Sequence, residues 1–235
     1  GYEHEIELGE SFWNIMLQRY GLSLEILDGN FSSIPKDGPL ILVANHPFGI
    51  LDGLILGYIM SKSRPDFKIL ANQVFCKSDD LNDIILPISF DETKEASKMN
   101  IATRLSALNF LDNGGAIGVF PGGTVSTAQS PFGVPMDPGW RSFTAKMITR
   151  SDAQVVPIFF EGHNSRLFQV ASHIHYNLRM GLLIKEFKSK VGNPVKIAIG
   201  NPLSDTAIKS RSGNPRILMD FLREETYKLS RTPLD

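Results

Sequence analysis

Short apolar segments alternate with longer stretches of helical periodicity along this 235-residue chain. The second apolar segment is a continuous run, Leu40-Ile41-Leu42-Val43, as expected of a buried strand. We predict strands at residues 23–27, 39–45, 67–71, 84–88, 116–120, 154–160 and 195–199, and helices at residues 53–61, 94–111, 140–150 and 215–229. This alternation predicts an α/β fold, a single domain whose mostly parallel or mixed sheet is flanked by helices.

The helix at residues 94–111 shows the clearest periodicity. Ile101, Leu105, Leu108 and Leu111 are spaced to form one apolar face of the helix. Asn-Gly-Gly at residues 113–115 is a typical helix stop signal. No repeat or long linker divides the chain, so we predict one domain over residues 1–235.

Composition narrows the possible partners. Hydrophobic residues make up 42% of the chain and the net charge is -1, so no global positive field points to a nucleic acid. Cys76 is the single cysteine, which excludes an internal disulfide and fits a reducing cytoplasm. No apolar run approaches the ~20 residues that span a bilayer, and the acidic first residues are unlike a signal peptide. Any work on lipid is therefore expected at the membrane surface.

A histidine and an aspartate flank the turn after the buried strand. Residues 45–53 read Asn-His-Pro-Phe-Gly-Ile-Leu-Asp-Gly, with His46 and Asp52 six positions apart. Ligands of open α/β sheets bind at the carboxyl ends of the strands. A histidine there can act as a general base, and a carboxylate within reach would fix its tautomer and stabilise the imidazolium. The alternative is that His46 caps the next helix or fills a polar pocket.

A glycine pair follows the strand at residues 116–120. Phe-Pro-Gly-Gly-Thr-Val-Ser at residues 120–126 exposes backbone N–H groups near Gly122, Gly123 and Thr124, which could hold an anion or a developing oxyanion. The alternative is a plain turn that ends the strand.

These blocks resemble motifs of the glycerolipid acyltransferase superfamily, which includes the lysophosphatidic acid acyltransferases. The usual first motif has four residues between His and Asp, whereas five separate His46 and Asp52 here. That spacing resembles the hemolysin-like branch with the lyso-ornithine lipid O-acyltransferases. The resemblance spans residues 40–203 and includes Val-Pro-Ile-Phe-Phe-Glu-Gly at 156–162, which looks like the fourth motif.

Two positions depart from the usual third block, Phe-Pro-Glu-Gly-Thr-Arg-Ser. Gly122 replaces the glutamate and Val125 replaces the arginine. Loss of the arginine removes a bidentate partner for a phosphate, so an acceptor without phosphate is favoured. Arg166 is then a candidate for an anionic head group, with an exposed helix-start arginine as the alternative. Asn45, beside His46, completes the predicted substrate contacts.

The resemblance implies an enzyme of lipid metabolism, an acyltransferase in which His46 is the general base and Asp52 its partner. The preferred acceptor is a lyso-aminolipid such as lyso-ornithine lipid. The implied co-substrate is a thioester of acyl carrier protein or coenzyme A, with no further cofactor and no metal. The expected location is the cytoplasmic face of a bacterial inner membrane. Alternatives are 1-acylglycerol-3-phosphate acylation, as in phospholipid biosynthesis, and a peripheral lipid-binding protein without catalysis.

Two segments are candidates for membrane contact. Within the N-terminal helix predicted in residues 1–22, the apolar segment at residues 12–20 could lie in the interface or pack on the core. Residues 178–187 could line a lipid entrance or form a core helix. Lys185, Lys188 and Lys190 could meet anionic lipid or an acidic carrier protein, or simply be solvated.

Overall fold

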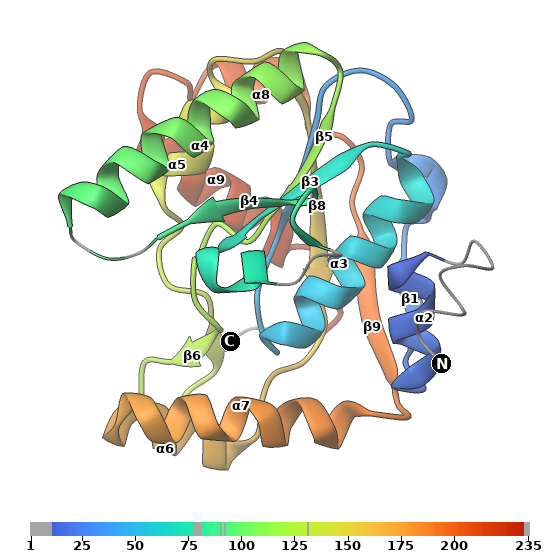
Figure 1. Ribbon diagram of the computed structural model, residues 1–235, viewed down its shortest axis with the longest axis vertical. Helices are drawn as coiled ribbons and strands as arrows, with labels where there is room; N and C mark the ends of the chain where they lie inside the picture. The colour runs from blue at the N-terminus through green and yellow to red at the C-terminus, as the bar shows by residue number, and fades with distance from the viewer. Residues whose placement is uncertain (1–10, 78–80, 90, 92, 131, 233–235) are drawn as a thin grey trace.

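A seven-stranded sheet organises the computed structural model, which describes residues 11–77, 81–89, 91, 93–130 and 132–232 (Figure 1). The strand order is β1-β9-β8-β2-β5-β3-β4. Neighbouring strands are parallel except β8 and β9, so β1 and β9 run opposite to the rest. The strands are β1 (Ser23–Asp28), β2 (Leu40–Ala44), β3 (Phe67–Asn72), β4 (Ile85–Ile88), β5 (Ala116–Val119), β8 (Gln154–Phe160) and β9 (Pro194–Ile199). The predicted α/β fold with a mixed sheet is confirmed.

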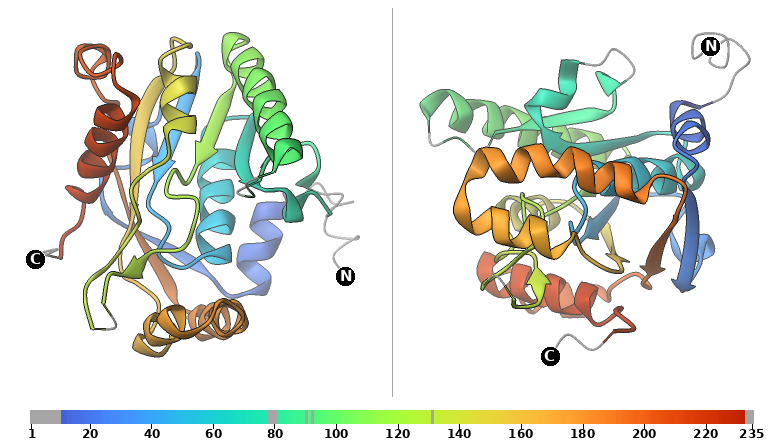
Figure 2. Two further views of the ribbon diagram at one scale, coloured as in Figure 1. Left: turned by 90° about the vertical axis from the view of Figure 1, so that its left-hand side faces the viewer. Right: turned by 90° about the horizontal axis from the view of Figure 1, so that it is seen from below.

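Helices cover both faces of this sheet (Figure 2). Alternate residues of β2 point to opposite layers, since Leu40 and Leu42 pack in the core under α3 (Ile50–Ser63), whereas Ile41 and Val43 pack under helices of the other face. The second layer consists of α4 (Lys94–Asp112), α5 (Ser142–Ile148), α8 (Asp205–Lys209) and α9 (Pro215–Tyr227). Burial on both faces explains why β2 is apolar without alternation.

Smaller elements make up the rest of the regular secondary structure among the described residues. They are α2 (Phe12–Arg19), the 3₁₀ turns η1 (Phe31–Ser33) and η2 (Gln73–Lys77), the short hairpin β6 (Thr127–Ala128) with β7 (Pro135–Met136), and the helices α6 (Arg166–Ile174) and α7 (Tyr176–Lys190). Within the described ranges, no helix has both the length and the apolar character that crossing a bilayer requires. The predictions that concern residues 1–10 lie outside the described residues.

The apolar face predicted for α4 is buried only in part. Ile101 and Leu105 are 50% and 60% exposed, and the helix instead packs through Ala107 and Leu111. Thr103 adds a buried polar anchor, because its hydroxyl donates to the Pro87 carbonyl at 2.6 Å. The spacing of apolar residues therefore did not identify the face that α4 buries. The end of the helix before Gly114 was predicted correctly.

The apolar side chains of α2 are buried in the protein. Trp13, Ile15 and Leu17 are 5%, 1% and 6% exposed. Trp13 lies against Gly57 of α3 and 6.0 Å from the ring of Phe67. The core-packing alternative is therefore correct for this helix, and these three side chains are not available to a membrane.

The close contact between α2 and α3 requires a glycine at position 57. A Cβ atom there would lie 2.1 Å from the Trp13 ring. We expect Gly57→Ala to displace the indole and lower the free energy of unfolding by about 1–3 kcal/mol. Gly53→Ala, in the same helix with open space around its Cβ, is the control and should raise stability by up to about 1 kcal/mol. Urea unfolding measures both, and equal stability of the two variants would contradict this packing.

Candidate active site

The turn between β2 and α3 holds a buried carboxylate at the carboxyl edge of the sheet. Gly49 adopts φ +87° before the first turn of α3, and the N–H groups of Phe48 and Gly49 donate to Asp52 Oδ2 at 2.8 and 2.9 Å. A Cβ atom at position 49 would also press on Leu183 and Val125, at 3.2 and 3.3 Å. Glycine is therefore required both by the backbone conformation and by the close neighbours.

His46 and Asp52 form a direct pair. His46 Nδ1 lies 2.9 Å from Asp52 Oδ2, with the histidine side chain 18% exposed and the aspartate fully buried. Burial raises the pKa of Asp52, while His46 and the N–H groups of Phe48 and Gly49 act against that rise by stabilising the carboxylate. Because Nδ1 is held by the carboxylate, Nε2 is the nitrogen that can exchange a proton with a substrate.

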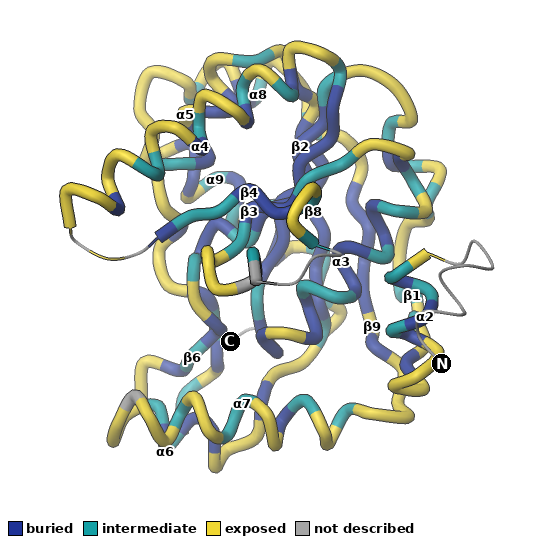
Figure 3. The backbone as a smooth tube through the Cα atoms, in the orientation of Figure 1, coloured by how far each residue is buried: buried dark blue, intermediate teal, exposed yellow. Residues whose placement is uncertain are grey.

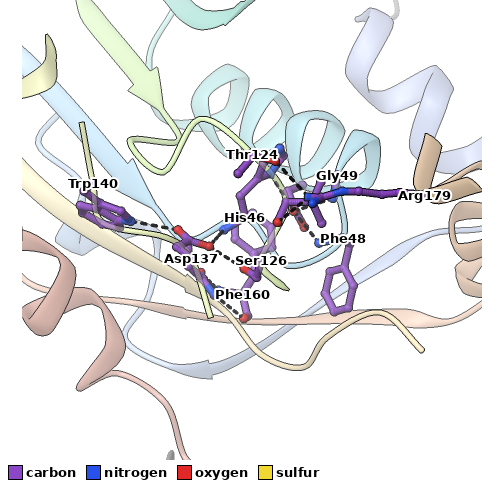
Figure 4. Close-up of polar contacts among 12 residues, drawn as sticks. His46, Phe48, Gly49, Thr124, Ser126, Asp137, Trp140, Phe160 and Arg179 are labelled. Carbon is purple, nitrogen blue, oxygen red and sulfur yellow. Dashed lines mark hydrogen bonds and ion pairs between the residues drawn. The ribbon is translucent and has the colours of Figure 1, made fainter. Parts of the chain in front are cut away.

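The segment after β5 holds His46 from the other side. Phe120 stacks on the imidazole with ring centroids 4.3 Å apart. The N–H of His46 donates to Asp137 Oδ1 at 3.0 Å, and the N–H of Ser126 donates to the His46 carbonyl at 2.8 Å (Figure 4). Ring and backbone of the histidine are therefore both fixed by residues far away in the sequence.

Asp137 is a buried residue with several hydrogen-bond partners, and the sequence analysis did not identify it. Its carboxylate accepts from the Ser126 hydroxyl and from Trp140 Nε1, the latter at 2.9 Å, in addition to the His46 N–H. Its own N–H donates to the hydroxyl of Tyr227 at 2.7 Å. Burial and the neighbouring Asp137 charge raise the pKa of Tyr227, so the phenol stays neutral. No local motif marks Asp137, because three of these four partners, His46, Ser126 and Tyr227, lie 91, 11 and 90 positions away.

The glycine turn adjoins Asp137. The N–H of Gly123 donates to the Phe120 carbonyl at 3.0 Å and so closes the turn itself. Of the backbone donors predicted for an oxyanion, those of Gly122 and Thr124 therefore remain candidates. A Cβ atom at Gly122 would lie 3.2 Å from the Asp137 carboxylate. A glutamate, usual at this position in the motif that the block resembles, would meet a like charge here.

Asn45 has a different role from the predicted substrate contact. Its side chain is buried, its Nδ2 donates to the Phe160 carbonyl at 3.0 Å, and its Oδ1 accepts from the Phe160 N–H at 2.7 Å. The amide thus joins the ends of β2 and β8 and sets where His46 emerges from the sheet.

Two arginines reach this end of the molecule in different ways. Arg166 is exposed at the start of α6, and its Nη1 donates to the Gly133 carbonyl at 2.9 Å. Arg179 of α7, which sequence reasoning missed, donates from Nη2 to Thr124 Oγ1 at 2.9 Å and to the Val125 carbonyl at 2.8 Å. Arg179 therefore brings positive charge to the predicted site block. Only the tertiary fold places α7 there, so sequence spacing gave no signal.

A cavity of about 410 Å³ opens beside Phe120. Leu70, Ile88, Val119 and Phe143 provide apolar walls, and its lining also includes Gly123 of the glycine turn. His46 and Asp52 do not line it, since Phe120 stands between the imidazole and this space. The lining of the cavity also contains the polar residues Ser89, Asn100, Arg141, Ser142 and Thr144, so only its apolar side suits part of an alkyl chain.

The partly exposed His46 and the fully buried Asp52 lie beside a glycine turn at the carboxyl edge of an α/β sheet, an arrangement in which an imidazole can accept a proton. A family model described as acyltransferase matches residues 12–235. The chain belongs to this acyltransferase family, within the glycerolipid acyltransferase superfamily, and is an acyltransferase.

Two relatives are similar over most of their length. The lyso-glycine lipid O-acyltransferase of Phocaeicola vulgatus is 28% identical over 220 residues, covering 88% of this chain and 75% of the relative. The protein of the same name from Bacteroides thetaiotaomicron is 26% identical over 236 residues, covering 97% and 82%. The solved 1-acyl-sn-glycerophosphate acyltransferase PlsC of Thermotoga maritima shares the fold, with a TM-score of 0.54, 18% identity, and coverage of 93% and 80%.

The role of Asn45 can be tested through stability. Asn45→Ala would leave the buried N–H and carbonyl of Phe160 without these partners, and we expect the free energy of unfolding to fall by about 2–4 kcal/mol. Asn193→Ala, which removes hydrogen bonds at an exposed site, is the control and should change stability by less than about 0.5 kcal/mol. Unfolding of the wild type and both variants in urea gives the comparison. Unchanged stability with a raised KM for the acceptor would restore the predicted substrate contact.

Proposed function

We propose that this enzyme transfers a fatty acyl group from a thioester donor to the hydroxyl of a lyso-aminolipid, with His46 as general base. The observation that carries this proposal is the 2.9 Å contact between His46 Nδ1 and a fully buried Asp52 carboxylate. A base held in this way directs Nε2 toward an incoming hydroxyl, and the carboxylate stabilises the imidazolium that forms. The two relatives named lyso-glycine lipid O-acyltransferases support an acceptor of this kind.

The proposed reaction needs no acyl-enzyme. His46 Nε2 removes the proton from the acceptor hydroxyl while its oxygen attacks the thioester carbonyl. The tetrahedral intermediate carries its negative charge on the former carbonyl oxygen, for which the N–H groups of Gly122 and Thr124 are candidate donors. The carbon–sulfur bond then breaks, and the imidazolium returns the proton to the leaving sulfur. The products are an ester and a free thiol of coenzyme A or of an acyl carrier protein.

Arg179 supports an acceptor with a free carboxylate. A lyso-lipid in which a 3-hydroxy fatty acid is amide-linked to an amino acid retains the carboxylate of that amino acid. The guanidinium of Arg179, held at Thr124 and Val125, can pair with such a group while the hydroxyl reaches His46. Glycine as the head group follows the names of the relatives, and the ornithine predicted from sequence shares the same carboxylate.

The apolar side of the cavity beside Phe120 is the proposed place for part of one alkyl chain. The lining of the cavity includes Gly123, which lies in the chain between the two proposed oxyanion donors, Gly122 and Thr124. In this arrangement the ring of Phe120, which stacks on the imidazole of His46, lies between that imidazole and the alkyl chain.

Removing the base or its charge partner should stop catalysis without unfolding the protein. We expect His46→Ala and Asp52→Asn each to lower kcat by roughly 10²–10⁴-fold. The side-chain amide of the second variant can still accept from the N–H groups of Phe48 and Gly49, so the fold is kept while the charge is lost. The rate is measured as thiol release from acyl-coenzyme A or from an acyl carrier protein thioester, with lyso-glycine lipid, lyso-ornithine lipid or lysophosphatidic acid as acceptor. Thermal unfolding of each variant is the control that it remains folded.

Wild-type turnover by His46→Ala would overturn the mechanism. Lipid retention by the wild-type protein with no thiol release from either donor would instead favour a non-catalytic lipid-binding protein. Strict preference for lysophosphatidic acid over lyso-glycine and lyso-ornithine lipid would replace the proposed acceptor with the phosphate-bearing one.

Arg179 should govern acceptor affinity. We expect Arg179→Gln to raise the KM for a carboxylate-bearing lyso-lipid roughly tenfold or more, because a charged hydrogen bond contributes about 1.5–3 kcal/mol, with the KM for the acyl donor unchanged. Arg166→Gln is the matched control, since Arg166 is exposed and contacts Gly133. Steady-state kinetics with each substrate varied in turn gives the comparison. A larger acceptor effect in Arg166→Gln would return the head-group role to Arg166, as predicted from sequence.

A further inference from the structure

The α6–α7 hairpin forms a separate layer over the carboxyl edge of the sheet. Seen from below, the two helices lie side by side across that end of the molecule (Figure 2). They pack on each other, and the break between them is short because His175 both ends α6 and caps α7. The two helices therefore form much of the surface at this end of the protein (Figure 2).

The hairpin exposes an unusual number of large apolar side chains. Those of Leu167, Ile174, Leu178, Met180 and Ile184 are between 43% and 67% exposed. Phe132 and Val134 add two more at 82% and 43%, in the loop that Arg166 ties to α6. Of the fourteen large apolar side chains exposed in the described part of the chain, these seven belong to the hairpin and to the loop tied to it. Much of the backbone of α6 and α7 is exposed (Figure 3). The core-helix alternative for residues 178–187 is therefore wrong for Leu178, Met180 and Ile184, whereas Phe187 packs against the core.

Positive charge accompanies this apolar surface. Residues 166–190 contain five cations and one acid, a net of +4, whereas the whole chain has a net charge of -1. Arg166, Lys185 and Lys188 are exposed. The single acid, Glu186, is buried against Ser165 and accepts from its N–H at 3.0 Å. Apolar side chains mixed with exposed lysines are typical of helices that lie in the interface of an anionic bilayer.

The inner side of α7 reaches the catalytic turn. Leu183 lies against Gly49, and Lys190 Nζ lies 4.8 Å from the ring centroid of Phe48. Arg179 contacts Thr124 from the same helix. A surface that binds the outer side of the hairpin is therefore separated from the His46 turn by one helix, which suits a substrate that arrives from a bilayer.

We propose that the α6–α7 hairpin docks this enzyme on the surface of an anionic bilayer. The exposed apolar side chains enter the interface, and Lys185 and Lys188 pair with lipid head groups. The proposal deepens the proposed function, since a lyso-lipid acceptor resides in a membrane, but its test measures binding and does not depend on turnover.

Vesicle flotation tests the apolar contribution. We expect the wild type to bind vesicles of phosphatidylcholine with phosphatidylglycerol, and Leu178→Asp/Ile184→Asp to reduce the partition coefficient roughly tenfold or more. Leu105→Asp/Ile217→Asp is the matched control, because these side chains are 60% and 52% exposed on α4 and α9. Absence of wild-type binding, or equal losses in both double variants, would overturn the proposal.

A second pair of variants tests the charge. Lys185→Gln/Lys188→Gln should weaken binding to anionic vesicles roughly tenfold or more, since each lysine near such a surface contributes about fivefold. Lys146→Gln/Lys209→Gln, with exposed lysines on α5 and α8, should bind like the wild type. If the first pair keeps vesicle binding but loses affinity for acyl carrier protein, the surface is a carrier site and the proposal fails.

Activity on a dispersed acceptor separates docking from catalysis. With a short-chain lyso-lipid below its aggregation concentration, Leu178→Asp/Ile184→Asp should keep the wild-type kcat/KM, and with vesicle-embedded acceptor it should lose activity in proportion to binding. Equal loss on both acceptors would assign these residues to the active site and overturn the docking role. An inactive wild type that still floats with anionic vesicles would refute the proposed function alone.

Discussion

Asp52 places a carboxylate in the first turn of α3 without solvent contact, and the geometry of the proposed active site depends on how that charge is held. Two backbone N–H groups and the imidazole of His46 converge on one oxygen, Oδ2. A charge buried without such donors would be strongly unfavourable. The same contacts fix the path of the chain from Phe48 to Gly49, so stabilisation of the carboxylate and orientation of the histidine cannot be separated.

The second constraint on His46 comes from the later half of the chain. Asp137 accepts the N–H of His46 and is itself held by Trp140 and by Tyr227. Arg223 of α9 donates to the Asp137 carbonyl at 2.8 Å. A helix near the end of the sequence thereby supports the histidine near its beginning. The turn that carries His46 and Asp52 is a local structure, but residues from distant parts of the chain hold it in place.

Local patterns predicted those parts of the structure that local forces determine. The apolar run of β2, the helix stop at Gly114 and the pairing of His46 with Asp52 each arise within about ten residues, and the structure shows all three. Asn45, Asp137 and Arg179 act through partners 115, 90 and 55 positions away. No periodicity or motif encodes such contacts. The buried face of α4 was not identified for the same reason, because its burial is set by the sheet edge.

The two departures from the usual third motif acquire a common explanation in three dimensions. Position 122 is a glycine where Asp137 already brings a carboxylate to within 3.2 Å of a Cβ atom. Position 125 is a buried valine whose carbonyl accepts from the guanidinium of Arg179. Other segments therefore bring an acidic group, Asp137, and a basic group, Arg179, to the backbone of these two positions. Arg179, unlike a residue of the turn itself, belongs to the helix whose outer side carries the proposed membrane surface. In the proposed arrangement, the helix that docks on the bilayer therefore also carries Arg179, the residue proposed to bind the head group of the acceptor.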